Sequence, residues 1–228
     1  MSELFALVTG SSSGIGKEIC THLLKNHYTV FGVSRRGSTI EHENYIDILA
    51  DIRDELAVED MYKIVAETTE GLDLIINAAG ICVISPLHET PSKEFLDHLQ
   101  TNVLGPFHVL KHGIEFVIES VTHVINISSI ASRVGLPDMG AYCASKFALS
   151  GLIGVCSKEW KSMGVRFTNL NPGAIDTPLW DNADSAAPRE KMMKIADFIN
   201  IFNMVINSSS DVEFPDISFL PREGVSPQ

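Results

Sequence analysis

The chain has 228 residues, of which 45% are hydrophobic and 20% charged, and its formal net charge is −12. This length suits one domain with a large core, so we expect a single domain over residues 1–228, ending in a loose tail at 222–228. The acidic balance argues against nucleic acid and anionic membranes as partners, because both are bound through basic surfaces. The sequence has no signal-peptide pattern and no apolar run of membrane-spanning length. We therefore expect a cytoplasmic protein.

Short apolar runs alternate with longer helical patterns along the chain. We predict strands at 4–9, 28–34, 45–50, 72–77, 123–128, 165–170 and 216–221. We predict helices at 14–26, 54–69, 91–119, 139–162 and 188–207, the third with Thr90 as N-cap and Pro91 as its first residue. This alternation, with fully apolar strands, predicts a doubly wound parallel sheet of about seven strands with helices on both faces. Only ten residues separate the second and third strands, so we expect an abbreviated crossover there.

A glycine-rich segment, TGSSSGIG at 9–16, joins the first predicted strand to the first predicted helix. In a dinucleotide-binding turn, Gly10 would allow the tight turn and Gly14 would let the backbone approach a pyrophosphate. Gly16 would let the helix pack closely on the sheet, and the helix N-terminus would offer free N–H groups to the phosphates. Taken alone, the segment could also be an ordinary glycine-rich turn. Its place between a strand and a helix favours phosphate binding.

The second predicted strand ends in VSRRG at 33–37, which contains no acidic residue. An NAD site usually places a carboxylate here to hold the ribose 2′-hydroxyl, whereas an NADP site has an arginine nearby. Ser34 occupies the position of the acid, and an arginine can pair with a 2′-phosphate through charge-assisted hydrogen bonds. The pattern could be a solvated turn, but its position favours NADP(H), and NAD(H) stays possible. We expect Arg35 to contact the phosphate and Arg36 to stack on the cofactor or reach the same group.

Residues 141–146 read AYCASK and place Tyr142 and Lys146 four positions apart, on one face of a helix. By itself the pair could be an ordinary helix surface. Lowering a tyrosine pKa by about three units requires roughly 4 kcal/mol of preference for the phenolate. A lysine at 4 Å supplies about 1 kcal/mol in water and about 4 kcal/mol at an effective dielectric of 20. The pair could therefore act as a proton donor only where it is partly dry and a cationic nicotinamide lies nearby.

Five features together resemble the short-chain dehydrogenase/reductase family: the glycine loop, NAAG at 77–80, Asn102, ISS at 127–129 and the Tyr142–Lys146 pair. The resemblance runs from about residue 4 to about residue 180. It implies a Rossmann-type sheet in the family's common single-domain form. It also implies hydride transfer between a nicotinamide and a carbonyl or alcohol.

The resemblance implies a catalytic set made of Asn102, Ser129, Tyr142 and Lys146. Tyr142 would exchange a proton with the substrate oxygen, and Lys146 would lower the Tyr142 pKa and bind the nicotinamide ribose. Ser129 would hold the substrate oxygen through its hydroxyl. Asn102 would support a water that links Lys146 to solvent.

The resemblance also implies cofactor contacts along the strand ends and a substrate wall. Trp180, in the loop 179–190 that the family uses as a substrate lid, would line the substrate pocket. Asp51 and Ile52 would hold the adenine. The remaining contacts would be Gly10, Ser12, Ser13, Gly14, Ile15 and Gly16 on the phosphates, Asn77, Ala78 and Gly80 under the ribose, and Pro172, Gly173, Ile175 and Thr177 at the nicotinamide.

Metal binding and assembly are the remaining questions. His108 and His112 share a predicted helix face, but no HExxH pattern or carboxylate companion accompanies them in the sequence, so we expect a surface pair and no metal site. The other histidines carry no pattern. The helices around 101–119 and 139–162 correspond to those that the family uses in its dimer contact, so we expect a homodimer. The divergent end DISFLPREGVSPQ leaves a tetramer open.

We therefore expect an NADP(H)-dependent carbonyl reductase or alcohol dehydrogenase that acts on a small molecule. The alternative is a catalytically idle NADP(H)-binding sensor or scaffold protein with the same fold. The complete set of Asn102, Ser129, Tyr142 and Lys146 argues against this alternative, because a sensor has no need of the acid. The sequence identifies neither the substrate nor the direction of the reaction.

Overall fold

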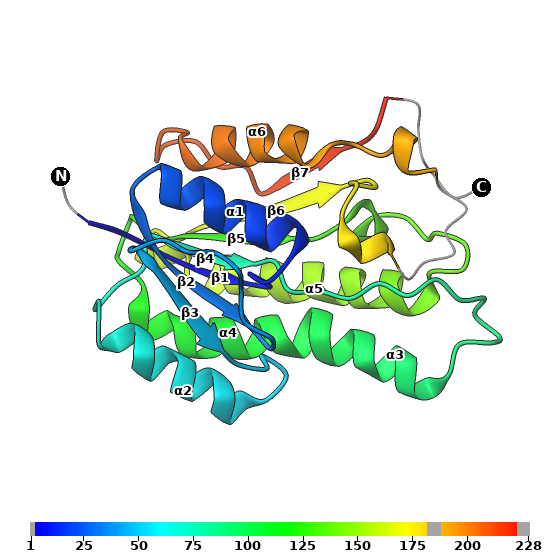
Figure 1. The fold of residues 1–228 in the computed structure, drawn as a ribbon, viewed down its shortest axis with the longest axis horizontal. Helices are drawn as coiled ribbons and strands as arrows, with labels where there is room; N and C mark the ends of the chain where they lie inside the picture. The colour runs from blue at the N-terminus through cyan, green and yellow to red at the C-terminus, as the bar shows by residue number, and fades with distance from the viewer. Residues whose placement is uncertain (1–2, 182–187, 223–228) are drawn as a thin grey trace.

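The computed structural model describes residues 3–181 and 188–222 of the chain. Of the predicted tail, only Arg222 falls within them. Seven strands form one parallel sheet in the order β3-β2-β1-β4-β5-β6-β7 (Figure 1), which confirms the predicted fold class. The strands are β1 (Leu4–Thr9), β2 (Tyr28–Ser34), β3 (Tyr45–Leu49), β4 (Leu74–Asn77), β5 (His123–Ile127), β6 (Arg166–Pro172) and β7 (Asp216–Phe219).

Helices cover both faces of the sheet (Figure 1). Successive residues of a strand point to opposite faces, so Leu7 packs in the core on one face while Ala6 and Val8 pack in the core on the other. Both faces are apolar, which explains the continuous apolar runs in the sequence. Among residues 3–181 and 188–222, every helix is too short or too polar to span a lipid bilayer. One face carries α1 (Gly14–Lys25) and α6 (Ile195–Ile206); the other carries α2 (Glu55–Ala66), α4 (Gly105–Gly113) and α5 (Gly140–Glu159).

The crossover from β2 to β3 is short, as predicted. Residues 35–44 are all described and contain no helix. Ile40 and Tyr45 pack into the core on the α1 side of the sheet, where a crossover helix would otherwise lie. A Cβ atom on Gly32 would lie 2.1 Å from the Tyr45 phenol oxygen, so the strand needs a glycine there to admit the ring. Ile40 and Tyr45, with Gly32 leaving room for the tyrosine ring, thus cover the part of the sheet that a crossover helix would cover.

The predicted helix at 91–119 is interrupted. It consists of α3 (Ser92–Leu99), a π-helical segment (Gln100–Leu104), α4 and a 3₁₀ turn (Ile114–Phe116). The predicted N-cap is wrong by one residue: Pro91 is the N-cap, and the Thr90 hydroxyl donates back to the Pro86 carbonyl at 3.0 Å. The π-helical segment contains Asn102, and such segments often occur at functional sites. The predicted helix at 188–207 begins only at Ile195, because Arg189–Lys191 form a separate 3₁₀ turn.

Candidate active site

A cleft of about 1020 Å³ opens at the carboxyl ends of the strands. The chain leaves β1 towards β2 and β3 on one side and returns to β4 on the other, so the strand order reverses between β1 and β4. Ligands of open α/β sheets bind at such a switch point, outside the carboxyl ends of the strands. The volume lies at the upper end of the range of about 300–1,000 Å³ found for ligand pockets. The cleft is therefore large enough for an extended ligand.

The glycine loop forms one wall of the cleft. Gly10 has φ +76° and Gly14 has φ +55°, both in the left-handed region that favours glycine. A Cβ atom on Gly10 would lie 2.8 Å from the backbone of Ala79, and one on Gly16 would lie 2.3 Å from the Gly10 carbonyl oxygen. The Gly10 amide donates to Val33 O at 2.8 Å, which ties the loop to the end of β2. The tight turn and the close packing predicted from the sequence are both present.

The residues that follow β2 and β3 form the next part of the cleft. The Ser34 hydroxyl is buried and has no hydrogen-bond partner among residues 3–181 and 188–222, so a ligand could use it. Arg35 and Arg36 are exposed and line the cleft. Asp51 also lines the cleft, and the Arg53 guanidinium beside it holds the pKa of that carboxyl below its usual range. Arg53 was not predicted as a site residue, because its only signal in the sequence is its position two residues after Asp51.

Tyr142 and Lys146 lie on the first turns of α5, next to the end of β5. Their side chains are buried, at 8% and 4% exposed, and both line the cleft. The Lys146 ammonium lies 5.7 Å from the centre of the Tyr142 ring and donates to Ile127 O at 2.9 Å. Ser129, two residues past the end of β5, also lines the cleft, and its hydroxyl oxygen accepts the Ala131 amide at 3.1 Å. The structure thus brings a phenol, an ammonium and a hydroxyl together on one wall.

Burial dominates the electrostatics of this pair. It raises the pKa of Tyr142, and the neighbouring Ser129 hydroxyl offsets only part of that increase. It lowers the pKa of Lys146 to about 8. The pair therefore meets the condition of dryness, but the protein groups alone do not lower the Tyr142 pKa. Lowering it requires a further positive charge in the cleft, as the Coulomb argument from the sequence indicated.

Asn102 is fully buried behind the cleft wall and is not one of the lining residues. Its carboxamide accepts the Ile81 amide at 2.9 Å and donates to the Ile81 carbonyl at 3.0 Å. It also donates to the Ser145 hydroxyl at 2.9 Å. A Cβ atom on Gly80 would lie 3.3 Å from the Asn102 carboxamide oxygen and 3.8 Å from the Lys146 ammonium. Asn102 thus joins the loop after β4 to α5 close to Lys146, and the water expected there stays a prediction.

The NAAG turn lines the cleft with its backbone and small side chains. Thr9 Oγ1 accepts the amides of Ala78 and Ala79 at 3.1 and 3.2 Å, which fixes the turn. The side chain of Asn77 is 2% exposed, points into the sheet and donates to the carboxamide oxygen of Asn126 at 2.9 Å. Of the predicted site residues, Asn77 and Asn102 lie behind the cleft. Those that line it are Gly10, Ser12, Ser13, Gly14, Ile15, Gly16, Arg35, Arg36, Asp51, Ile52, Ala78, Gly80, Ser129, Tyr142, Lys146, Pro172, Gly173, Ile175, Thr177 and Trp180.

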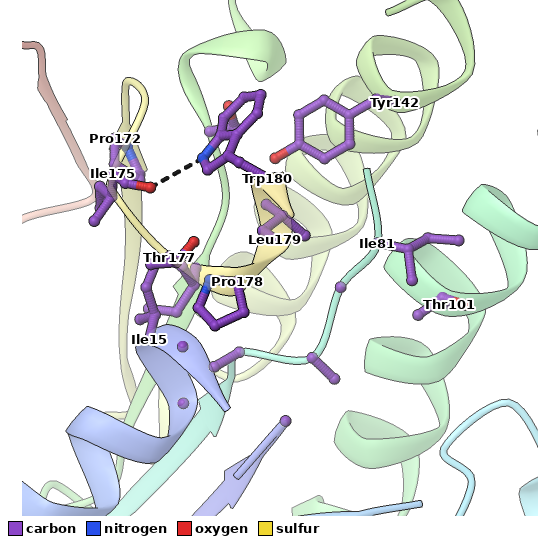
Figure 2. Close-up of a pocket in the computed structure, with 18 of the residues that line it drawn as sticks. Ile15, Ile81, Thr101, Tyr142, Pro172, Ile175, Thr177, Pro178, Leu179 and Trp180 are labelled. Atoms are coloured by element: carbon purple, nitrogen blue, oxygen red, sulfur yellow. Dashed lines mark hydrogen bonds between the residues drawn. The ribbon is translucent and has the colours of Figure 1, made fainter. Parts of the chain in front are cut away.

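The opposite end of the cleft is apolar. Trp180 donates its indole N–H to Ile175 O at 2.9 Å, and Figure 2 shows its ring facing Tyr142, with Leu179 and Ile81 beside the gap. Of the predicted lid at 179–190, residues 182–187 lie outside the described residues. The other apolar side chains that line this end come from three separate loops, where residue spacing carries no chemical pattern. They are Ile84, Val134, Leu136, Met139 and Leu179.

Two histidines differ from their predicted surroundings. His108 is buried rather than on the surface, with its Nδ1 atom 3.0 Å from Ile52 O. His112 does meet two carboxylates, Glu55 and Glu59, which α2 brings within 4.8 Å. The ammonium group of Lys111 already pairs with the Glu55 carboxylate. A positively charged side chain therefore offsets part of the negative charge of this cluster. The sequence could not show these contacts, because the two helices are about 50 residues apart.

His98 supports the wall on which Tyr142 lies, although the sequence singled out no role for it. The ring is fully buried, and its Nε2 atom accepts the Val83 amide at 3.1 Å. Nδ1 therefore carries the proton and donates to Glu94 O at 2.8 Å. The ring packs edge to face with Tyr142 at 6.4 Å between centres. His98 thus anchors the loop after β4 against the tyrosine.

Comparisons with known proteins find matches in both sequence and fold. A family model described as short chain dehydrogenase matches residues 4–188. The 3-amino-tetrahydro-pyrrolizinone reductase of Xenorhabdus hominickii is 34% identical over 79% of this chain, and the chain spans only 65% of that protein. The NADPH-dependent pterin aldehyde reductase of Arabidopsis thaliana is 33% identical over 76% of this chain and 75% of that protein. The solved structure of an alcohol dehydrogenase from Thermococcus sibiricus, complexed with 5-hydroxy-NADP, superposes with a TM-score of 0.86 at 24% identity and covers 98% of each chain.

Proposed function

The chain belongs to the short-chain dehydrogenase family, and on that premise we propose that it is an NADP(H)-dependent oxidoreductase. It transfers a hydride between the nicotinamide and the carbonyl or alcohol of a small molecule, with Tyr142 as the proton donor and acceptor. The observation that most directly supports this proposal is that one cleft holds both the glycine loop and the buried Tyr142–Lys146 pair. A catalytic pair outside the cofactor cleft could not serve this reaction.

Each residue of the wall has a distinct part in the proposed reaction. The cofactor supplies the hydride when it is bound in the cleft. Tyr142 gives its phenolic proton to the substrate oxygen during reduction and takes one back during oxidation. The Ser129 hydroxyl donates to the same oxygen, where negative charge develops. The Lys146 ammonium favours the phenolate through its charge, and burial strengthens this effect because water screens it less.

Three features support a preference for NADP(H). Ser34 takes the place of the carboxylate that an NAD site usually carries, and Arg35 and Arg36 follow it at the edge of the cleft. The Arabidopsis relative is named as NADPH-dependent. Fluorescence titration of the protein with NADPH and with NADH tests this preference directly. Equal affinities would contradict the role given to Arg35.

The Tyr142→Phe variant tests the proposed reaction. Its turnover of a panel of ketones, aldehydes and diketones is measured from the absorbance of NADPH. Loss of the proton donor should lower kcat by about 10²–10⁴-fold while NADPH affinity stays nearly unchanged. Tyr28→Phe is the matched control, because it removes one phenol oxygen outside the cleft-lining residues. Near-normal turnover by Tyr142→Phe would contradict the assignment. Tight NADPH binding by the wild type without turnover of any carbonyl would favour the sensor.

The surface of α5 supports the proposal of a homodimer. Phe107 on α4 and Phe147 on α5 are 41% and 48% exposed. At Gly151 and Gly154, farther along α5, an added Cβ atom would meet nothing within 4 Å. A projecting ring beside two unobstructed glycines on one helix face can pair with a second copy across a two-fold axis. Sedimentation velocity should show a dimer for the wild type and a monomer for Phe147→Glu, and a wild-type monomer would contradict the proposal.

A further inference from the structure

Two basic residues and one acidic residue meet at the same edge of the cleft. β2 and β3 are parallel neighbours, with Ser34 in register with Leu49. The residues that follow the two strands therefore emerge side by side, which places Arg35 and Arg36 next to Asp51. Arg35 lies close enough to Asp51 for its charge to contribute to lowering the pKa of that carboxyl. An unrestrained carboxylate at this position would compete with a ligand anion for the arginines.

Arg53 binds the Asp51 carboxylate and so keeps it from pairing with Arg35 or Arg36. The Arg53 Nε atom lies 3.0 Å from each carboxylate oxygen, and one Nη atom lies 2.6 Å from Oδ2. The Arg53 amide also donates to Oδ1 at 3.1 Å. Both side chains are one-third exposed, at 33% each, and both line the cleft. The planar guanidinium thus holds the carboxylate in one orientation, which a single ammonium could not do.

The pairing changes the charge that a ligand meets. In the part of the chain that the structure describes, Arg35 and Arg36 form no ion pair. Three arginines and one aspartate leave a net charge of +2 at this end of the cleft, in a chain whose formal net charge is −12. Without Arg53, Asp51 would be free to pair with Arg35. Only one arginine would then be left for a ligand anion.

We propose that Arg53 is a specificity-determining residue that sets the preference for NADP(H). It holds and neutralises Asp51, and it thereby leaves Arg35 and Arg36 free to bind a phosphate on the adenosine ribose. Arg53 acts through Asp51 and need not touch the phosphate itself. This inference rests on the proposed function, because it concerns the cofactor of the same cleft.

The experiment compares dissociation constants for NADPH and NADH by fluorescence titration, so it requires no substrate. Arg53→Gln should weaken NADPH binding about tenfold and NADH binding less than about twofold, because NADH lacks the phosphate. The double variant Arg53→Gln with Asp51→Asn removes both charges and restores the net charge of +2. It should return the NADPH-to-NADH ratio to within about threefold of the wild type. Arg53→Lys keeps the charge without the planar guanidinium and should give an intermediate ratio.

Each result separates one explanation from another. Equal weakening of NADPH and NADH by Arg53→Gln would overturn the inference, because it would mean that Arg53 contacts a group shared by the two cofactors. Failure of the double variant to recover would also overturn it, because Arg53 would then bind the phosphate directly. High salt should shrink the difference between wild type and Arg53→Gln. If the wild type binds neither dinucleotide, the proposed function itself fails, and if it binds both equally, the preference and this inference fail together.

Discussion

The glycine-loop end and the Trp180 end of the cleft are built from different parts of the chain. At the glycine-loop end, backbone groups form much of the surface, and Gly10 cannot be replaced without a clash against Ala79. At the Trp180 end, apolar side chains from several loops form the surface (Figure 2). Ser129 and Tyr142 lie between the two. A substitution in a surface made of backbone causes a clash or strain, whereas a substitution in a surface made of side chains alters its shape in smaller steps. Substitutions at the two ends should therefore have different kinds of effect.

A large effect on kcat is expected at the junction of the two ends. Ser129→Ala removes the hydroxyl that would hold the substrate oxygen, and kcat should fall about 10²–10³-fold. NADPH affinity should change less than about twofold, because the methyl group leaves the glycine-loop end intact. Steady-state kinetics and fluorescence titration measure the two quantities. A parallel loss of NADPH affinity would show that Ser129 belongs to the cofactor end.

Ser12→Ala is the matched control at the glycine-loop end, since Ser12 lines the cleft there. It should weaken NADPH binding a few-fold and leave kcat nearly unchanged, the reverse of Ser129→Ala. A large loss of kcat in Ser12→Ala would break the distinction between the two ends.

Lys146→Met should stabilise the folded protein while it abolishes activity. Burial lowers the Lys146 pKa from 10.5 to about 8, a difference worth roughly 3 kcal/mol at about 1.4 kcal/mol per pKa unit. The folded state therefore binds fewer protons than the unfolded state between these values, so wild-type stability rises as pH increases from about 8 to 10.5. Below pH 8 the free-energy cost of burying the Lys146 charge is fully present. Methionine removes this cost, and it also removes the hydrogen bond to Ile127 O.

Urea unfolding of wild type and Lys146→Met across this pH range checks the prediction. The advantage of the variant should be largest near neutral pH, at about 1–3 kcal/mol, and should shrink towards pH 10.5. An advantage that does not depend on pH would mean that the lysine charge carries no cost in the folded state.

Gly10→Ala and Gly14→Ala compare two kinds of cost within the glycine loop. Both residues have positive φ, which costs an alanine about 1–2 kcal/mol. Only Gly10 would also clash, since its Cβ atom would lie 2.8 Å from the Ala79 backbone while that of Gly14 would approach Thr177 no closer than 3.7 Å. Gly10→Ala should therefore lower the free energy of unfolding by about 2–3 kcal/mol, and Gly14→Ala by about 1 kcal/mol. Urea unfolding ranks the two, and equal losses would contradict the steric argument.

At the Trp180 end the expected effect is confined to KM. Trp180→Ala removes an apolar wall, so KM for an apolar carbonyl substrate should rise about tenfold, equivalent to about 1.4 kcal/mol. The NADPH dissociation constant should stay the same. Trp180→Phe keeps an aromatic wall and loses the N–H bond to Ile175 O, so its KM should fall between those of wild type and alanine. A change in NADPH affinity in either variant would place Trp180 at the cofactor end.

The elements predicted correctly from the sequence are those that depend on a local pattern of residues. β1 and β2 have the predicted bounds, because short apolar runs ended by glycine or polar residues are typical of buried strands. The π-helical segment around Asn102 was not predicted, because an inserted residue does not change the apolar spacing enough to be seen. Asn77 was predicted on the cofactor side, but the alternation of β4 turns its side chain towards Asn126.

The fold class, the glycine loop and the Tyr142–Lys146 pair could all be predicted from the sequence alone. The fold class follows from the alternation of apolar strands with helical patterns along the chain, and the loop and the pair each depend on residues within one strand–helix unit or one helical turn. The three-dimensional structure was needed to show that Asn102 donates to the Ser145 hydroxyl, that Trp180 faces Tyr142 and that Arg53 pairs with the Asp51 carboxylate. The first two contacts join residues about 40 positions apart. They depend on how the loops after neighbouring strands pack at one edge of the sheet, and no spacing along the chain records that packing.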